Sequence, residues 1–191
     1  MRSIMLREER VQATINLHES SWSPYYKFLP GLIRERRYTC GIEIGVYSGG
    51  HARAILDAGV NLLVGIDPYK MFENNMLGLN DQADWDCLHD LTQARLHDKA
   101  YLHMRRTSDD SVQFLTLPFD FVFIDGLHTY EQAKKDLDNY SQLIRPGGVI
   151  LCDDYNPKDF PGIVQAIDEF ATNHALEIKN GPMSVIYMDK L

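Results

Sequence analysis

The feature that most constrains the fold of this chain is an alternation of short apolar runs with segments of helical periodicity. Each run is short enough to be a buried strand and ends near an acidic residue, a glycine or another polar position. The runs are Cys40–Gly45, Leu62–Asp67, Ala100–Met104, Phe119–Asp125, Val149–Asp153 and Ser184–Met188, with Leu176–Ile178 as a weaker candidate.

Apolar residues between these runs recur three or four positions apart, as on one face of a helix. The three stripes are Ala52, Ile55, Leu56 and Gly59; Ala133, Leu137, Tyr140 and Ile144; and Ile163, Ile167, Phe170 and Ala171. Thr129 and Gln132 have the spacing of a capping box at the start of the second helix. Strands that alternate with helices predict parallel, right-handed crossovers, and therefore a doubly wound α/β sheet.

Two segments lie outside this alternation. Residues 1–37 precede the first strand and are expected to form a helical N-terminal extension, and residues 38–191 are expected to form the main domain. Residues 69–98 are a long insertion between the second and third strands, with a helix expected through Cys87 and Leu91. Because ligands of open α/β sheets bind outside the carboxyl ends of the strands, both segments are candidates to cover a pocket there.

Composition narrows the class of protein. Of the 191 residues, 45% are hydrophobic and 24% are charged, as in a globular protein with a core. A net charge of −8 argues against nonspecific nucleic-acid binding, which requires clustered cations. The three cysteines form no CxxC pair. No signal-peptide or membrane-spanning run is evident, so we expect a cytoplasmic protein.

A glycine-rich turn follows the first strand, in the sequence Glu43-Ile-Gly-Val-Tyr-Ser-Gly-Gly50. Glycine lets the backbone approach a ligand closely, and the following helix begins with unpaired N–H groups. Glu43 stands where a dinucleotide-binding loop has its first glycine, and a carboxylate there suits a cationic ligand better than a pyrophosphate. The alternative is an ordinary strand-to-helix turn with a solvated Glu43.

Acidic and hydroxyl groups also end the next two strands. Asp67 ends the second strand about twenty residues beyond the glycine turn, where many nucleoside-binding folds hold the ribose hydroxyls. The polar segment of residues 105–111 follows the third strand and could bond to an adenine edge. The alternatives are a turn at Asp67-Pro68 and a helix cap within residues 105–111.

The fourth and fifth strands deliver Asp125, Asp153 and Asp154 to the same edge of the predicted sheet. Three carboxylates at one place repel one another unless they hold a hard cation such as Mg²⁺. His128 follows Asp125 by three positions and could accept a proton from a substrate hydroxyl near neutral pH. The alternatives are a capping or solvated aspartate and a surface histidine. The other histidines have no comparable neighbours in the sequence.

Together these segments resemble the class I S-adenosylmethionine-dependent methyltransferases. The turn at 43–50 is similar to the E/D-x-G-x-x-x-G motif of that superfamily, and Asp67 matches its acidic ribose-binding position. Residues 119–155 are similar to a small methyltransferase family whose fourth strand ends in IDG-x-H-x-Y and whose fifth ends in DDY. The resemblance covers roughly residues 38–190 and implies a Rossmann-like, mostly parallel sheet of seven strands.

The resemblance also implies roles for single residues. The methionine part of S-adenosylmethionine would lie along Glu43, Gly45, Tyr47 and Ser48, its ribose on Asp67, and its adenine between Ser108 and Asp109. In metal-dependent O-methyltransferases of this class, groups at the ends of strands four and five hold Mg²⁺. The matching residues are Asp125, Asp153 and Asp154. Asp125 and His128 are the catalytic candidates, and Asp125 is also a cofactor-binding candidate. Catechol-specific relatives have a lysine base at the position of His128.

The expected function is therefore metal-assisted O-methylation of a small hydroxylated molecule, without a nucleic-acid or membrane partner and with a homodimer as the base-rate expectation. Three alternatives remain open at this level: an NAD-dependent oxidoreductase, a metal-dependent oxygenase on the same scaffold, and a non-catalytic assembly protein. The sequence does not identify the methyl acceptor.

Overall fold

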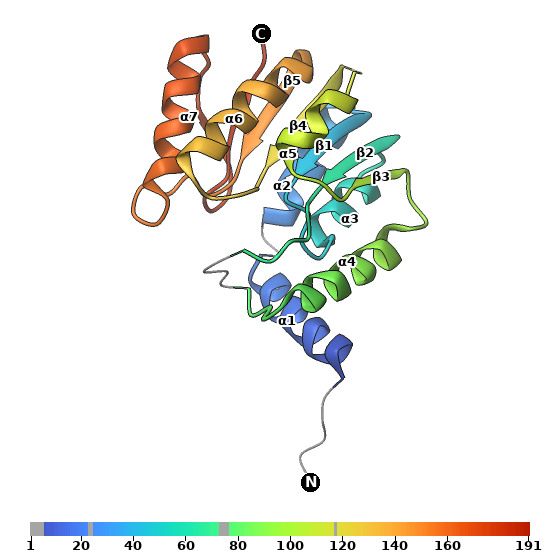
Figure 1. Ribbon diagram of the computed structural model, residues 1–191. Coiled ribbons are helices and arrows are strands. Elements are labelled where there is room, and N and C mark those ends of the chain that lie inside the picture. Colours follow the sequence, from blue (N-terminus) through green and yellow to red (C-terminus); the bar gives the residue numbers. More distant parts are fainter. Residues whose placement is uncertain (1–5, 23–24, 73–76, 117) are drawn as a thin grey trace.

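The computed structural model describes residues 6–22, 25–72, 77–116 and 118–191, which form one twisted sheet with helices on both faces (Figure 1). The strands are β1 (Cys40–Ile44), β2 (Leu62–Ile66), β3 (Tyr101–Met104), β4 (Phe119–Ile124), β5 (Ile144–Cys152), β6 (Lys179–Asn180) and β7 (Ile186–Asp189). The 7-stranded sheet has the order β3-β2-β1-β4-β5-β7-β6. Strands β1 to β5 are parallel, and β7 runs antiparallel to both β5 and β6. The predicted doubly wound, mostly parallel sheet is confirmed.

Helices follow the strands in the predicted order. The α-helices are α1 (Arg7–Trp22), α2 (Phe28–Arg36), α3 (Gly50–Asp57), α4 (Gln82–Leu96), α5 (Ser108–Ser111), α6 (Tyr130–Tyr140) and α7 (Pro161–His174). Single 3-10 turns occur at η1 (Tyr25–Lys27), η2 (Val112–Phe114) and η3 (Ser141–Leu143). Thr129 caps α6 by accepting a hydrogen bond from the Gln132 N–H, as the capping pattern predicts. The division at residue 37 into a helical extension and a main part, within a single structural domain, stays a prediction.

The two faces of the sheet have separate cores. Alternate residues of β1 and β4 point to opposite faces, so Ile42 and Val122 pack with α6 and α7, whereas Phe121 and Phe123 pack with α2 and α3. A third, smaller core lies between α1 and α4 and includes Val11. The alternation of side chains between the two faces of the strands therefore accounts for the first two cores but not for the third.

One strand begins earlier than the sequence predicts. The expected strand at Val149–Asp153 starts at Ile144 and includes Pro146-Gly-Gly148. The pairing of β4 with β5 shifts register between Phe119 and Phe121, and Gly147 has a positive φ of 78°. Gly147 N–H donates to the Lys190 carbonyl at 2.8 Å. The glycines therefore form an irregular part of a strand that remains paired, because the C-terminal segment bonds to it.

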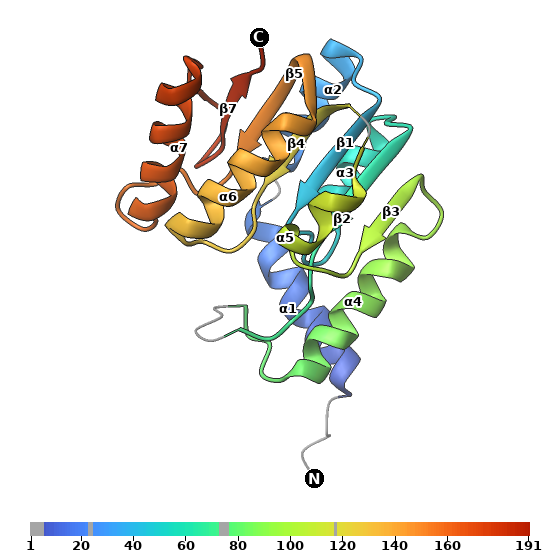
Figure 2. The same ribbon diagram turned by 45° about the horizontal axis from the view of Figure 1, so that its top comes forward.

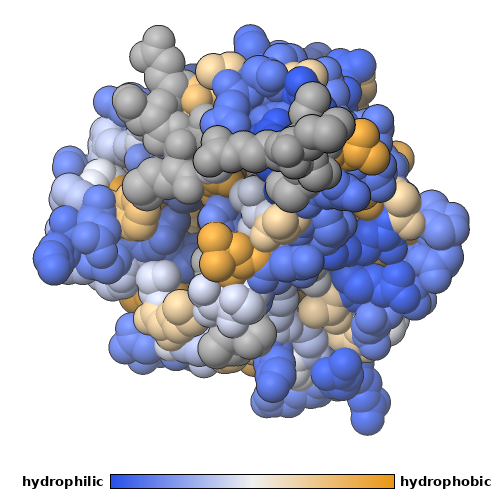
Figure 3. Space-filling view, turned by 90° about the horizontal axis from the view of Figure 1, so that it is seen from below, coloured by the Kyte–Doolittle hydropathy of each residue, from blue (hydrophilic) through white to orange (hydrophobic). Residues whose placement is uncertain are grey.

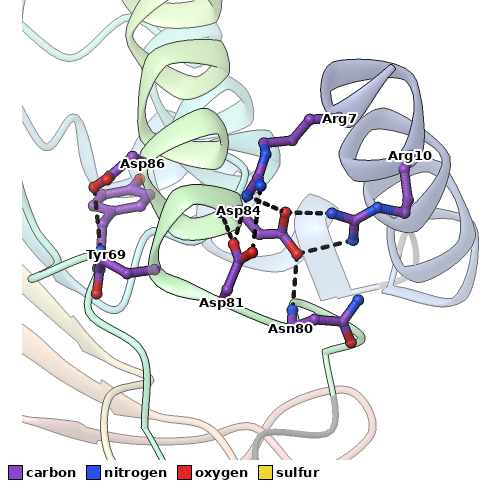
Figure 4. Close-up of polar contacts among 8 residues, drawn as sticks. Arg7, Arg10, Tyr69, Asn80, Asp81, Asp84 and Asp86 are labelled. Atoms are coloured by element: carbon purple, nitrogen blue, oxygen red, sulfur yellow. Dashed lines mark hydrogen bonds and ion pairs between the residues drawn. The ribbon is translucent and has the colours of Figure 1, made fainter. Parts of the chain in front are cut away.

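The helices α1 and α4 pack together beyond the carboxyl ends of the strands (Figure 2). Figure 4 shows the contact that joins them: Arg7 and Arg10 of α1 reach the carboxylate of Asp84 in the first turn of α4. Arg7 Nη1 lies 2.8 Å from Asp84 Oδ1, and the Asn80 N–H donates to Asp84 Oδ2 at 2.8 Å. The Asp84 side chain is fully buried. Among the described residues, no helix combines the length and apolar character needed to cross a membrane.

Candidate active site

The predicted site residues meet along one edge of the sheet because backbone bonds continue past the ends of the strands. Gly45 N–H donates to the Ile66 carbonyl at 2.9 Å, and Asp125 N–H donates to the Ile44 carbonyl at 2.9 Å. Asp153 N–H donates to the carbonyl of Ile124, the last residue of β4, at 3.0 Å. The turns after β1, β4 and β5 therefore lie side by side at the carboxyl edge.

The backbone conformation and close packing at position 45 require a glycine. It has a φ of 84°, and a Cβ added there would lie 1.8 Å from the carbonyl oxygen of Asp125. Any larger residue would force the turns after β1 and β4 apart. The glycine thus brings the glycine-rich turn against the turn that carries Asp125.

Asp67 braces the glycine-rich turn. Its Oδ2 atom accepts hydrogen bonds from the N–H groups of Val46 and Tyr47, both at 3.0 Å, and Oδ1 accepts from Tyr69 N–H at 2.8 Å. Burial raises the pKa of Asp67, while these three bonds oppose the shift. The structure thus gives Asp67 a structural role that the sequence did not reveal, and its role toward ribose stays a prediction.

Helix α1 covers the start of α3. Ser48 Oγ donates to Glu19 Oε1 at 2.5 Å, and Arg95 of α4 forms an ion pair with the same carboxylate. A Cβ at Gly50 would lie 2.6 Å from Glu19 Oε1. The buried Ser48 is therefore held by α1. Tyr47 also contacts α1, since its hydroxyl lies 3.1 Å from His18 Nδ1.

The pair predicted to flank adenine, Ser108 and Asp109, lies at the start of α5. Thr107 caps this helix by accepting from Asp110 N–H, so the alternative of a helix cap is present here. Gln132 of α6 donates through Nε2 to Ser108 Oγ at 3.1 Å and to Asp109 Oδ1 at 3.0 Å. These contacts fix the segment after β3 to α6, and its contact with adenine stays a prediction.

Gln132 also donates to Asp136, a carboxylate that the sequence analysis gave no role. Nε2 lies 3.0 Å from Asp136 Oδ1, and only 1% of Asp136 is exposed. Burial raises the pKa of Asp136 to about 6. The position of Asp136 on the core-facing side of α6, one turn after Gln132, is the sequence signal that could have identified it.

Three side chains gather at the ends of β4 and β5: Asp125, His128 and Asp154. His128 Nε2 lies 3.0 Å from Asp154 Oδ2 and 3.6 Å from Asp125 Oδ1, and one ligand atom of each residue lies within 4.8 Å of the others. Asp154 has a positive φ of 58°, which a non-glycine residue rarely adopts. The turn thus directs its side chain to His128.

Asp153 points elsewhere. Its Oδ1 atom accepts from Ser184 Oγ and from Asp154 N–H, both at 2.7 Å. The structure therefore gathers His128, rather than Asp153, with the two other aspartates. Asp153 nevertheless lies close enough to raise the pKa of Asp125 through its charge. Its part in metal binding stays a prediction.

The group is electrostatically unbalanced. Burial, with the nearby charges of Asp153 and Asp154, raises the pKa of Asp125 to about 8. Burial alone would lower the pKa of His128, but its bonds to Asp125 and Asp154 outweigh burial and raise the pKa to about 10. At neutral pH the imidazolium thus lies beside Asp154, while the raised pKa of Asp125 favours its protonated form.

The donor set fits a divalent ion. Two carboxylates and one imidazole each offer a ligand atom, these atoms lie within 4.8 Å of one another, and a bound cation would replace the proton of His128. Carboxylate oxygens suit Mg²⁺ and Mn²⁺, whereas an imidazole ligand favours Mn²⁺ and other transition metals. The site thus fits a divalent cation without selecting Mg²⁺ alone.

His51 is a site residue that the sequence analysis missed. It lies in the first turn of α3, and its Nδ1 atom is 2.8 Å from Glu43 Oε1. Glu43 and His51 are 1% and 4% exposed. Burial raises the pKa of Glu43, and the bond to His51 opposes that shift. The solvated Glu43 of the alternative interpretation is therefore wrong.

Comparison with known proteins adds family information. Residues 42–155 match the model of a family described as a methyltransferase domain. Among curated proteins, an uncharacterized protein of Acanthamoeba polyphaga mimivirus, R132, is 27% identical over 139 residues. That alignment covers 69% of this chain and 59% of the viral protein, so the chain spans less than two thirds of its relative.

Solved structures share the fold. An O-methyltransferase of Bacillus cereus in complex with S-adenosylhomocysteine (SAH) is 18% identical, with a TM-score of 0.63 and coverage of 98% of this chain and 94% of that one. The O-methyltransferase TomG of Streptomyces achromogenes, in complex with S-adenosylmethionine (SAM), is 17% identical, with a TM-score of 0.61 and coverage of 99% and 93%. At these identities the likeness establishes the architecture alone.

Proposed function

The chain belongs to the methyltransferase-domain family and has a class I methyltransferase fold. From this premise we propose that it methylates a hydroxyl group of a small molecule, with SAM as methyl donor and a divalent metal ion as cofactor. The family match favours this reaction over the oxidoreductase, oxygenase and assembly alternatives. The observation that carries the proposal is the convergence of Asp125, His128 and Asp154 beside the glycine-rich turn.

The edge formed by β1 and β2 supports a SAM site. Gly45 packs its turn against the turn that carries Asp125, Asp67 holds the turn in shape, and Glu43 offers a buried carboxylate two residues before Gly45. Structurally similar O-methyltransferases bind SAH and SAM on the same architecture. When bound, SAM supplies an activated methyl group, so the chain must mainly align an acceptor with it.

The edge formed by β4 and β5 supports activation of the acceptor. Asp125 and Asp154 would hold a divalent ion, which lowers the pKa of a coordinated hydroxyl. His128 carries a proton at neutral pH because its bonds to Asp125 and Asp154 raise its pKa, and a protonated imidazole cannot accept another proton. Its proposed role as the base therefore depends on a cation that balances Asp125 and Asp154.

The loops around the site are suited to a partly apolar acceptor. Exposed apolar side chains occur after β2 at Met71 and Phe72, after β4 at Leu127, and before β7 at Met183. Figure 3 views the molecule from the side of the carboxyl ends of the parallel strands. It shows separate apolar patches on a largely hydrophilic face. We propose a small acceptor with a hydroxyl group on an apolar or aromatic body, and a homodimer remains the expected assembly.

The test is transfer of a labelled methyl group from SAM to a panel of phenols, catechols and sugar hydroxyls, each with Mg²⁺, with Mn²⁺ and with excess EDTA. The proposal expects at least one hydroxylated acceptor to be methylated and EDTA to suppress the transfer. Transfer that is unchanged in EDTA would contradict the role of the metal. Methylation of amines alone, or product formation without a methyl donor, would contradict O-methylation.

A further inference from the structure

The buried pair of Glu43 and His51 is only half satisfied by the chain. Glu43 Oε1 accepts a hydrogen bond from His51 at 2.8 Å, but Glu43 Oε2 and His51 Nε2 have no hydrogen-bond partner among the described residues. Since an ionised carboxylate only accepts hydrogen bonds, His51 donates through Nδ1–H. Two unpaired polar atoms in a buried site point to a polar group that is not part of the chain.

The surroundings fix the imidazole in place. The ring of His51 lies against three aromatic rings, with centroid distances of 4.6 Å to Phe123, 5.2 Å to Tyr25 and 5.4 Å to Tyr26. These rings give His51 no hydrogen bond, so its orientation depends on their shape and on Glu43. In turn, the bond from His51 determines which carboxylate oxygen of Glu43 stays free.

The charge of the free atom defines the ligand group. Glu43 is the penultimate residue of β1, two residues before Gly45. A buried carboxylate oxygen is best satisfied by a cation or an N–H group. SAM and SAH both carry an ammonium group at their methionine or homocysteine end. The ammonium is therefore the part of the ligand that matches Glu43 Oε2.

We propose that His51 is a positioning residue for the amino-acid end of the cofactor: it holds Glu43 through Oε1 so that Oε2 faces the ammonium group of SAM or SAH. This inference rests on the proposed use of SAM. It predicts that His51 contributes to recognition of the amino-acid end and not of the adenosine end.

The experiment compares two ligands by calorimetry in the full chain: SAH and 5′-methylthioadenosine, which keeps the adenosine and the sulfur but lacks the amino-acid end. His51→Leu is expected to weaken SAH about tenfold, roughly 1.4 kcal/mol, and to change methylthioadenosine affinity by less than about twofold. The nearly isosteric His51→Asn keeps an N–H close to the position of Nδ1. It is expected to retain most of the SAH affinity.

Glu43→Gln tests the coupling of the two residues. It should weaken SAH selectively, and His51→Leu added to it should cause no further loss, because both changes remove the same interaction. If His51→Leu does not fold, His51→Gln replaces it, since the longer amide cannot place its N–H at the Nδ1 position. His51→Gln is then expected to weaken SAH where His51→Asn does not.

Equal weakening of both ligands in the folded His51 variant would indicate a purely structural role and overturn the inference. Unchanged SAH affinity would also overturn it. A wild-type chain that binds neither ligand would instead contradict the proposed cofactor, so the two failures are distinguishable.

Discussion

Asp67 and Asp125 follow the two strands that flank β1, yet their carboxylates have different hydrogen-bond partners. Asp67 accepts three backbone hydrogen bonds, which hold the glycine-rich turn. Asp125 shares a single imidazole with Asp154, and burial raises its pKa to about 8. The edge near β2 is thus held by hydrogen bonds within the chain, whereas the edge near β5 keeps acidic side chains that a bound cation could ionise and pair.

This difference assigns separate tasks to the two edges. A turn that is fully bonded before any ligand arrives can bind a cofactor without reorganisation. A cluster of acidic side chains that share one imidazole can bind a cation and an acceptor hydroxyl. Substitutions at one edge should therefore change cofactor binding or stability, and those at the other should change transfer.

The largest effect is expected at the β4–β5 edge. Asp154→Ala and Asp125→Ala should each reduce methyl transfer at least about 100-fold, because each removes a charged group from the reacting edge. SAH affinity, measured by calorimetry, should change less than about threefold. Asp90→Ala, an exposed acidic position on α4, is the matched control. A variant that loses SAH binding as completely as transfer would contradict the separation of tasks.

The next effect concerns Asp136, the buried carboxylate bonded to Gln132. Its pKa of about 6 lies above the unfolded value of 3.8, so ionisation disfavours the folded state. The penalty is absent below the unfolded pKa, grows as pH rises through the folded pKa, and reaches roughly 3 kcal/mol above it. Asp136→Asn should therefore gain stability relative to the wild type between about pH 4 and pH 7.

Urea unfolding at several pH values checks this prediction. Asp138→Asn, an exposed residue on the same helix, should show no such trend. A stability difference between the wild type and Asp136→Asn that does not depend on pH would count against the buried charge.

A smaller loss of stability is expected at the β1–β2 edge. Asp67→Asn leaves one acceptor oxygen for three N–H groups and turns an N–H donor toward the others, which should cost about 2 kcal/mol in the free energy of unfolding. SAH affinity should fall with it. Asp98→Asn, a half-exposed aspartate, is the control. Unchanged stability and affinity would show that Asp67 does not brace the turn.

The smallest effect is expected at the ion pairs between α1 and α4. Asp84→Asn keeps the shape of the side chain but removes the charge that pairs with Arg7 and Arg10. Because both arginines are partly exposed, the melting temperature should fall by only about 3 °C. Limited proteolysis should cut α1 sooner in this variant than in Asp90→Asn. Equal cleavage rates would mean that the apolar core alone holds α1.

The sequence predicted the sheet well because its strands are apolar runs bounded by polar residues. The order of strands and helices follows from that pattern. The placement of α1 does not, because it depends on contacts such as Ser48 with Glu19, which are far apart in the chain. The irregular start of β5 likewise depends on pairing with the C-terminal segment.

The candidate site was predicted to the level of the sheet edge. Asp125, His128 and Asp154 could be grouped from their places after two neighbouring strands. The direction of Asp153 could not, since it depends on Ser184 from another loop. His51 was missed because its significance lies in a bond to Glu43, and a single histidine in an apolar helix gives no such signal.

The most direct test of the two-edge account is calorimetric titration of SAH into the wild-type chain and into Asp154→Ala, each with Mg²⁺ and with EDTA. The account predicts one-site, saturable SAH binding in the wild type and in Asp154→Ala. It also predicts that metal removal changes the SAH affinity of the wild type alone. Absence of saturable SAH binding in the wild type, with or without metal, would contradict it.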